Sequence, residues 1–327
     1  MKKLLKNSTF FIFLVLIAMC VFTAIAEPAF LKISNILSTA RAFSSIAIAG
    51  IGVLMVILTG GIDLSAGSIY GLSGVISAMC CFNLGMPVFP AIVMGILAGA
   101  VFGFINSLLV IYCKLPPFIA TLGTQQIVRG VCTILTKGYP ISKLPEGYMF
   151  LGQGEFLGIP MAVWCMIIVA IICHIFLEET VTGRRIFALG GNAEATRISG
   201  INTKGLLMLV YTLCAVLASF AGIITASKLG VGQPTAGTGF ETDAISAAVI
   251  GGASLSGGAG SVVGTVIGAA IIGVLRNALV LLKVDSYWQM LIMGLVIVGA
   301  VMMICMLILG WLISRMKIAQ ALKLGED

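Results

Sequence analysis

Charged residues are scarce in this sequence. Asp, Glu, Lys and Arg make up 9% of its 327 residues, whereas 60% of the residues are hydrophobic. Soluble globular domains carry about 25% charged residues, so this composition excludes a soluble domain. Inside a bilayer the backbone must satisfy its own polar groups, and helices do so without any partner segment. We therefore predict an all-α, polytopic membrane protein in which residues 1–327 form a single transmembrane domain.

Residues for metal, redox or nucleotide chemistry are also missing. His174 is the only histidine, and none of the nine cysteines forms a Cys-x-x-Cys pair, which argues against a metal or redox site. No Gly-x-x-x-x-Gly-Lys-Ser/Thr motif occurs, so we expect no ATP site in this chain. No Ser/His/Asp or paired-carboxylate arrangement stands out. We therefore expect no catalytic residue, no cofactor and no enzyme activity.

Ten apolar segments are candidates for membrane spans. They lie at about residues 10–26, 43–59, 65–82, 88–112, 118–135, 161–177, 205–227, 244–255, 261–282 and 288–312. The eighth is short enough for a half-helix, and Trp288 and Trp311 suit the membrane interface. The first run also fits a signal peptide cleaved after Ala26, although we prefer an uncleaved span.

The basic residues predict the orientation. Ten spans place both ends of the chain on one side of the membrane. With the N-terminus inside, eleven of the 19 Lys and Arg residues face the cytoplasm, six face outward, and Arg129 and Arg276 fall within spans. The positive-inside rule therefore predicts both ends in the cytoplasm. We assign the net charge of +7 to these loops rather than to nucleic-acid binding.

One stretch, LTGGIDLSAGSIYGLSG at residues 58–74, interrupts an apolar run with glycines and a carboxylate. Backbone that leaves the helix inside a bilayer must be buried in protein or line an aqueous cavity. Asp63 is one of only twelve acidic residues, and an ionisable residue within a membrane is a candidate functional group. A tight turn in which Asp63 caps the next helix is the alternative, and we favour the cap.

The same stretch has an echo later in the chain. Gly-Gly-x-x-Leu-Ser-x-Gly occurs at residues 60–67 and again at 251–258. Paired broken helices in two halves of a chain point to a transport site, although 40 glycines also make a coincidence plausible. Polar groups in or near the spans, including Asn106 and Gln125, need partners from each other, from water or from a solute. The candidate pathway residues are Gly60, Gly61, Asp63, Ser65, Asn106, Phe118, Gln125, Gly251, Gly252 and Ser256.

Two stripes of small residues predict close helix packing. Gly95, Gly99 and Gly103 share one face of the fourth span, and glycines at 260, 264 and 268 do the same near the ninth. Small residues at this spacing allow helices to approach closely. We expect both stripes to pack within one chain rather than between subunits.

The longest hydrophilic stretch runs from Glu178 to Lys204. Within it, residues 192–200 have the composition of a short helix, with Asn192 as a plausible N-cap and Gly200 as the glycine that ends it. A short cytoplasmic helix between spans suits docking of a partner. A solvated linker is the alternative.

Four motifs resemble the permease subunit of ribose-type ABC sugar importers. They are GGIDLSAGS (60–68), FIATLGT (118–124), TGRRIFALGGNAEATRISGI (182–201) and IGGASLSGGAGSVVGTVIGA (250–269), and they occur in the family's order over nearly the whole chain. The resemblance implies a permease in the bacterial inner membrane that translocates a monosaccharide. It also implies three partners: a cytoplasmic ABC ATPase, an extracytoplasmic sugar-binding protein, and a second copy of the chain in a homodimer.

The resemblance further implies that residues 191–201 form the coupling helix that contacts the ATPase. Gly191, Ala195 and Gly200 are the motif positions, and we add Glu194 and Arg197 as polar contacts to the partner. Two other functions stay open. An ion-coupled secondary transporter would use Asp63 as its coupling-ion site. A non-transporting membrane scaffold would carry no solute.

Overall fold

A computed structural model of the chain describes residues 8–296, 298–299 and 302, and these are almost entirely helical. The helices are α1 (Ser8–Ala26), η2 (Pro28–Leu31), α2 (Ile33–Leu58), α3 (Ala66–Phe82), α4 (Val88–Ile111), α5 (Pro117–Thr136), α6 (Glu146–Gln153), α7 (Met161–Glu179), α8 (Val181–Gly191), α9 (Ala193–Ile198), α10 (Thr203–Leu229), α11 (Phe240–Ile250) and α12 (Val262–Leu281). In the described residues, β1 (Glu155–Phe156) and β2 (Ile159–Pro160) form a small antiparallel hairpin. The predicted all-α class is confirmed.

Seven of the described helices are long and apolar enough to cross a bilayer, namely α1, α2, α4, α5, α7, α10 and α12. Two further apolar helices, α3 and Ser286–Val296, are shorter, and α11 has only 11 residues, as the predicted half-helix requires. The prediction of a polytopic membrane protein is therefore confirmed. The latter part of the predicted tenth span, including Trp311, lies outside the described residues.

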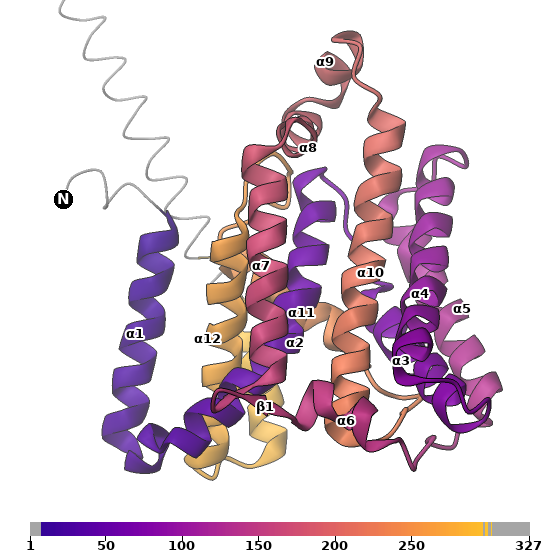
Figure 1. Cartoon of the computed structure of the whole chain (residues 1–327). Helices are drawn as coiled ribbons and strands as arrows, with labels where there is room; N and C mark the ends of the chain where they lie inside the picture. The colour runs from indigo at the N-terminus through magenta and orange to yellow at the C-terminus, as the bar shows by residue number, and fades with distance from the viewer. Residues whose placement is uncertain (1–7, 297, 300–301, 303–327) are drawn as a thin grey trace, which may run out of the picture.

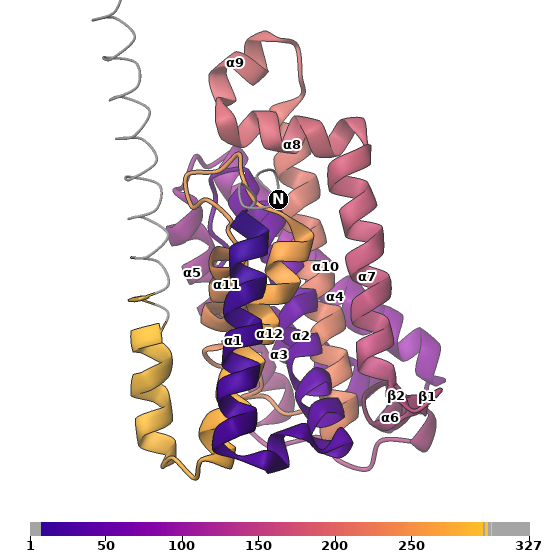
Figure 2. The same ribbon diagram turned by 90° about the vertical axis from the view of Figure 1, so that its left-hand side faces the viewer.

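The long helices run side by side, and most of the short elements lie at their two ends, whereas the short helix α11 lies within the bundle (Figure 1). α8 and α9 lie at one end, where α8 runs across the bundle (Figure 2). α6 and the β1–β2 hairpin lie at the opposite end (Figure 1). Because α8 and α9 come from the loop predicted to face inward, we refer to their end as the cytoplasmic end and to the other as the outer end.

α2 forms the centre of the bundle. Every residue from Ser44 to Leu58 is buried, and α10, α11 and α12 all pack against the helix. A helix that is apolar on all sides is stable only where protein or lipid surrounds it. Protein surrounds this half of α2, so its cytoplasmic end is held firmly where the first glycine pair begins.

α2 begins ten residues earlier than the hydropathy predicts, at Ile33 rather than at residue 43. Asn35, near its start, exchanges two hydrogen bonds with Asn277 of α12, with N–O distances of 3.0 and 2.8 Å. Thr39 donates to the carbonyl of Asn35 at 2.8 Å. Asn35 and Thr39 lower the hydropathy of this segment, but their polar groups are hydrogen-bonded within the protein. The helix therefore begins before the apolar run begins.

Two other segments differ from their predicted form. The polar stretch 137–160 contains α6 and the β1–β2 hairpin instead of an open loop. The short eighth segment begins at Phe240 and ends at Ile250, about four residues before its predicted place. Its first turn carries two acidic residues, which lower the hydropathy there but suit the positive end of a helix.

The glycine stripe of α4 packs within the chain, as predicted. A methyl group built on Gly95 would lie 2.7 Å from the Ser73 carbonyl of α3, and one built on Gly103 would lie 2.6 Å from the Tyr211 carbonyl of α10. On α12, Gly264 and Gly268 lie in the same way against the backbone of α11 and the residue that follows it. The absent side chains let these helices approach within backbone contact.

Replacing Gly103 by Ala is therefore expected to destabilise the protein. The added methyl group meets backbone that cannot rotate away, and overpacking of this kind costs about 1–3 kcal/mol. The measurement is the thermal unfolding midpoint in detergent. Gly123→Ala in α5 is the matched control, because nothing lies within 4 Å of its new methyl group. Equal midpoints for the two variants would contradict the packing described for α4.

Candidate functional site

The first broken segment joins α2 to α3. α2 ends at Leu58, and Gly60 turns the chain with a φ of +80°, a conformation that favours glycine. Asp63 then accepts hydrogen bonds from the backbone N–H of Ser65 at 2.8 Å and from its hydroxyl at 2.6 Å. The carboxylate therefore caps backbone that precedes α3, which is the role that the sequence favoured for it.

Two neighbouring helices hold this segment in place. Asn106 of α4 donates to the Ser65 hydroxyl at 2.8 Å, and Thr121 of α5 accepts from the N–H of Leu64 at 3.1 Å. Asp63, Ser65 and Asn106 are all 0% exposed. Asp63, Ser65 and Asn106 thus form a buried polar network that lines no open surface of the described chain, whereas Gly60, which was also predicted to lie on the pathway, is exposed.

The network leaves some of its oxygens unused. Asp63 Oδ2 and Asn106 Oδ1 have no hydrogen-bond partner within the part of the chain that the structure describes. Tyr211 of α10 lies beside the same segment, because a methyl group on Gly61 would lie 2.6 Å from its hydroxyl. A buried carboxylate surrounded by neutral donors suits a structural cap more closely than an ion-pairing group.

The second broken segment follows α11 and meets the first. Gly252, Gly257 and Gly258 have φ values of +91°, +87° and +74°, so the chain turns sharply here. The turn is closed by a hydrogen bond from the N–H of Ser254 to the carbonyl of residue 259 at 2.8 Å. The N–H of Gly258 donates to the carbonyl of Leu58 at 2.9 Å. The sequence echo therefore corresponds to two breaks in direct backbone contact.

A second polar group joins α5 to the start of α11. Gln125 donates to Glu241 at 2.9 Å, and Glu241 is only 8% exposed. Next to it, the rings of Tyr70 and Phe240 stack with centroids 4.2 Å apart. Sequence reasoning missed Glu241, although an acidic residue at the start of a short apolar helix was the available signal.

Arg129 holds the loop that leads into α11. Its guanidinium donates to the carbonyls of Pro234 and Ala236, both at 2.7 Å, and to that of Gly67 at 3.3 Å. Further along, Arg276 of α12 contacts both carboxylate oxygens of Asp243 at 2.7 Å. Arg129 and Arg276, the two cations predicted to lie within spans, are thus satisfied by backbone carbonyls and by a carboxylate, as burial in a membrane domain requires.

At the cytoplasmic end, α8 and α9 form an exposed helical hairpin. Asn192 accepts from the N–H of Ala195 at 2.9 Å and so caps α9, and Gly200 follows the helix with a φ of +78°. Both of these predicted features are confirmed. The structure also adds α8, which the sequence analysis did not predict.

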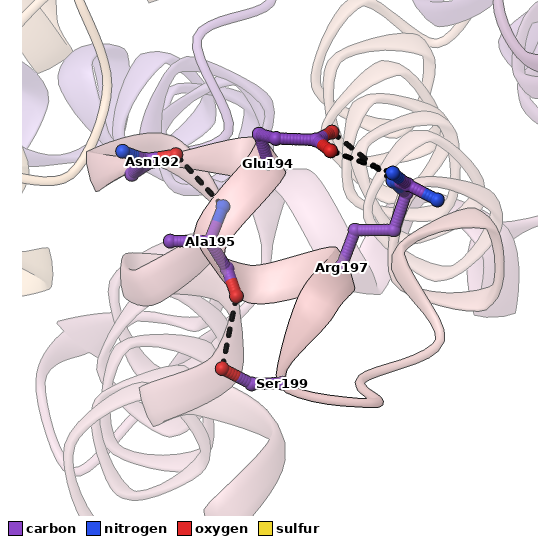
Figure 3. Close-up of polar contacts among 5 residues, drawn as sticks. All are labelled: Asn192, Glu194, Ala195, Arg197 and Ser199. Carbon is purple, nitrogen blue, oxygen red and sulfur yellow. Dashed lines mark hydrogen bonds and ion pairs between the residues drawn. The ribbon is translucent and has the colours of Figure 1, made fainter.

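The two charged residues of α9 pair with each other (Figure 3). Arg197 contacts Glu194 at 3.0 Å through Nε and at 2.6 Å through Nη2. Hydrogen bonding and the positive charge of Arg197 hold the pKa of the Glu194 carboxyl below its ordinary value. Both side chains are about two-thirds exposed, at 64% and 65%, so a partner protein can reach them.

Long apolar helices around two broken segments, with an exposed polar hairpin at one end, define a multi-pass membrane component of a transport system. Residues 35–301 match the family described as "Branched-chain amino acid transport system / permease component", and the chain belongs to this family. Among the described residues, no group of three or more His, Cys, Asp or Glu side chains could hold a metal ion.

Individual relatives match over most of the chain. The ribose import permease protein RbsC of Haemophilus influenzae is 42% identical over 89% of this chain and 91% of its own. The D-allose transport system permease protein AlsC of Escherichia coli is 37% identical over 90% of both chains. The xylose transport system permease protein XylH of Haemophilus influenzae is 32% identical over 91% of this chain and 96% of its own. No solved structure matches the chain.

These matches confirm the resemblance that the motifs carried. The chain is a multi-pass permease component of an ABC importer, a transport subunit rather than an enzyme.

Asp63→Ala is expected to destabilise the protein, whereas Asp63→Asn is expected to be mild. Alanine leaves the N–H and hydroxyl of Ser65 without their acceptor, which costs about 1–3 kcal/mol in a buried site. Asparagine keeps a carbonyl oxygen in the place of Oδ1. Thermal unfolding in detergent measures both variants, and equal losses for the two would show that the charge, not the hydrogen bonding, matters.

Proposed function

We propose that the chain is the permease subunit that carries a monosaccharide across the bacterial inner membrane. The observation that carries this proposal is the match to ribose, allose and xylose permeases over about nine-tenths of the chain. The relatives differ in their sugar, so the proposal names the substrate class and not one sugar. ATP is hydrolysed by a separate ABC ATPase, and an extracytoplasmic binding protein delivers the sugar.

The α8–α9 hairpin supports a docking role for the cytoplasmic stretch 178–204. α9 exposes its two charged residues, and it also exposes Ile198, whose side chain is 74% accessible. α9 projects beyond the spans with Glu194, Arg197 and Ile198 all exposed, which suits contact with another protein (Figure 1). We assign contact with the ATPase to this hairpin, with Gly191, Glu194, Ala195, Arg197 and Gly200 as the contacting positions.

The exposed face of α5 supports the proposal of a passage for a polar solute. α5 is the least hydrophobic of the seven span-length helices. Phe118 is 47% exposed on it, and Gln125, half-buried, bonds to Glu241. Phe118 and Gln125 lie about two helical turns apart on α5, and an exposed ring and an amide on one helix suit weak contact with a neutral polyhydroxyl solute. The two broken segments would then shape the cytoplasmic end of this passage rather than bind the sugar directly.

A homodimer would cover this face. A span with low hydropathy and an exposed surface is better satisfied by water or protein than by lipid. We propose that two copies of the chain face each other across the passage. Native mass spectrometry of the complex with its ATPase should find two permease chains in each particle, and a single chain would contradict this assembly.

Uptake into proteoliposomes tests the function. The chain, its ATPase and its binding protein should together import radiolabelled ribose or a related sugar only when ATP is present on the ATPase side. A proton ionophore should leave this uptake unchanged, because the energy comes from ATP. Uptake driven by an ion gradient without ATP would support a secondary transporter, and the absence of any sugar flux would support a scaffold.

Arg197→Glu and Gly200→Asp are each expected to weaken association of the ATPase with the tagged chain. Both changes place negative charge on the proposed docking surface, and Arg197→Glu also removes the ion pair with Glu194. Co-purification measures the association. Lys137→Glu is the control, because it replaces a positive charge by a negative one, as Arg197→Glu does, on an exposed residue at the outer end.

A double variant separates docking from internal stability. Exchanging the two charges, Glu194→Arg with Arg197→Glu, keeps an ion pair within α9 but reverses the charge at each position. We expect the exchange to weaken association as much as the single variant does. Full retention of the ATPase in the double and single variants alike would contradict the docking assignment.

A further inference from the structure

The end of α8 lies against both broken segments, and no side chain separates them. Gly190 is the second-last residue of α8. A methyl group built on it would collide with the carbonyl oxygen of Leu58 and approach the N–H of Gly258. Leu58 ends the helix before the first break, and Gly258 lies in the second. Gly190 is therefore at the point where the two breaks meet.

Gly257, in the second broken segment, takes part in the same contact. A methyl group on Gly257 would lie 2.9 Å from the backbone nitrogen of Gly60 and 3.0 Å from the carbonyl oxygen of Gly190. The hydrogen bond from Gly258 to Leu58, 2.9 Å long, joins the two breaks directly. We name this contact among residues 58, 60, 190, 257 and 258 the glycine junction.

Very short chain segments connect the glycine junction to α9. We refer to α8 and α9 together as the docking hairpin. Asn192 ends α8, since its N–H donates to the carbonyl of Ala188 at 3.0 Å. The same residue caps α9, since its side chain accepts from Ala195 at 2.9 Å. A displacement of α9 must therefore displace the end of α8. A contact between backbone atoms cannot be relieved by a change of side-chain rotamer. A shift of α8 therefore moves Leu58 and Gly258, which lie against Gly190.

We propose that the glycine junction transmits motion of the docking hairpin to both broken segments, and that Gly190 is the residue that makes this transmission possible. The inference rests on the proposed docking of α9 to an ATPase. It adds the route by which the ATPase acts on the membrane domain. One displacement of α8 moves the cytoplasmic end of α2 and the segment after α11 together. Gly190 is a positioning residue, because it acts through these segments and not on the sugar.

α10 offers a second route, because its first residue, Thr203, follows α9 closely along the chain. The two routes make different predictions for a change at Gly190. If α10 alone carries the motion, loosening the contact of α8 with the breaks leaves coupling intact. If the junction carries it, the same change separates ATP hydrolysis from sugar import.

The test is Gly190→Ala in the full complex of permease, ATPase and binding protein in proteoliposomes. The added methyl group is expected to push α8 away from Leu58. Sugar imported per ATP hydrolysed should then fall well below the wild-type ratio, because ATP hydrolysis continues while the two broken segments no longer follow α8. The ATPase should still co-purify and hydrolyse ATP. Gly147→Ala in α6 is the control, because it makes the same change in a helix with space around it, its nearest contact being 3.6 Å, and it should import as the wild type does.

An unchanged ratio of sugar to ATP in a folded Gly190→Ala complex would overturn the proposal. If this variant fails to fold, hydrogen exchange on the wild-type complex decides. ATP binding should then change exchange in residues 186–192 together with residues 57–61 and 254–259. A change confined to 186–192 would also overturn the proposal. A wild-type complex that neither binds the ATPase nor imports sugar would instead contradict the proposed function.

Discussion

Backbone that leaves a helix inside a membrane domain must find its hydrogen-bond partners in the protein, and this requirement organises the structure. At the first break Asp63 and Thr121 accept from N–H groups that have left the helix, and at the second the backbone closes on itself and on Leu58. Arg129 supplies donors to three carbonyls near α11. Each break can exist only where these groups are brought to it, which determines how α4 and α5 pack around α3.

Close packing of backbone against backbone gives this chain, which has few charged residues, a means of transmitting motion. Where side chains fill the space between helices, a displacement can be absorbed by rotamer changes. At the cytoplasmic end of this protein, glycines bring three stretches of backbone into contact, and such contacts shift as units. The exposed hairpin of α8 and α9 lies directly on this contact. Its position suits a permease whose energy source is outside the membrane, since the chain itself carries no nucleotide-binding motif.

Much of the fold could be predicted from the sequence, because hydropathy reports burial in lipid and protein alike. Hydropathy located the spans and the half-helix, and the residue type of Asn192 predicted the cap of α9. Hydropathy failed where polar side chains were satisfied by distant partners. The early start of α2 depends on Asn277, 242 residues away from Asn35, and no local pattern reveals that pairing. Glu241 and Asp243 were missed for the same reason, because Gln125 and Arg276 satisfy them from other helices. The repeated glycine motif was visible, but the contact between its two copies depends on the three-dimensional fold.

We infer that an ATPase acts on both broken segments through α8. Cryo-electron microscopy of the complex in the nucleotide-free and ATP-bound states can test this inference. The ATPase should lie against α9, and α8 should shift between the two states together with residues 57–61 and 254–259. A structure in which the ATPase contacts another surface, or in which α8 shifts while both broken segments stay in place, would contradict it.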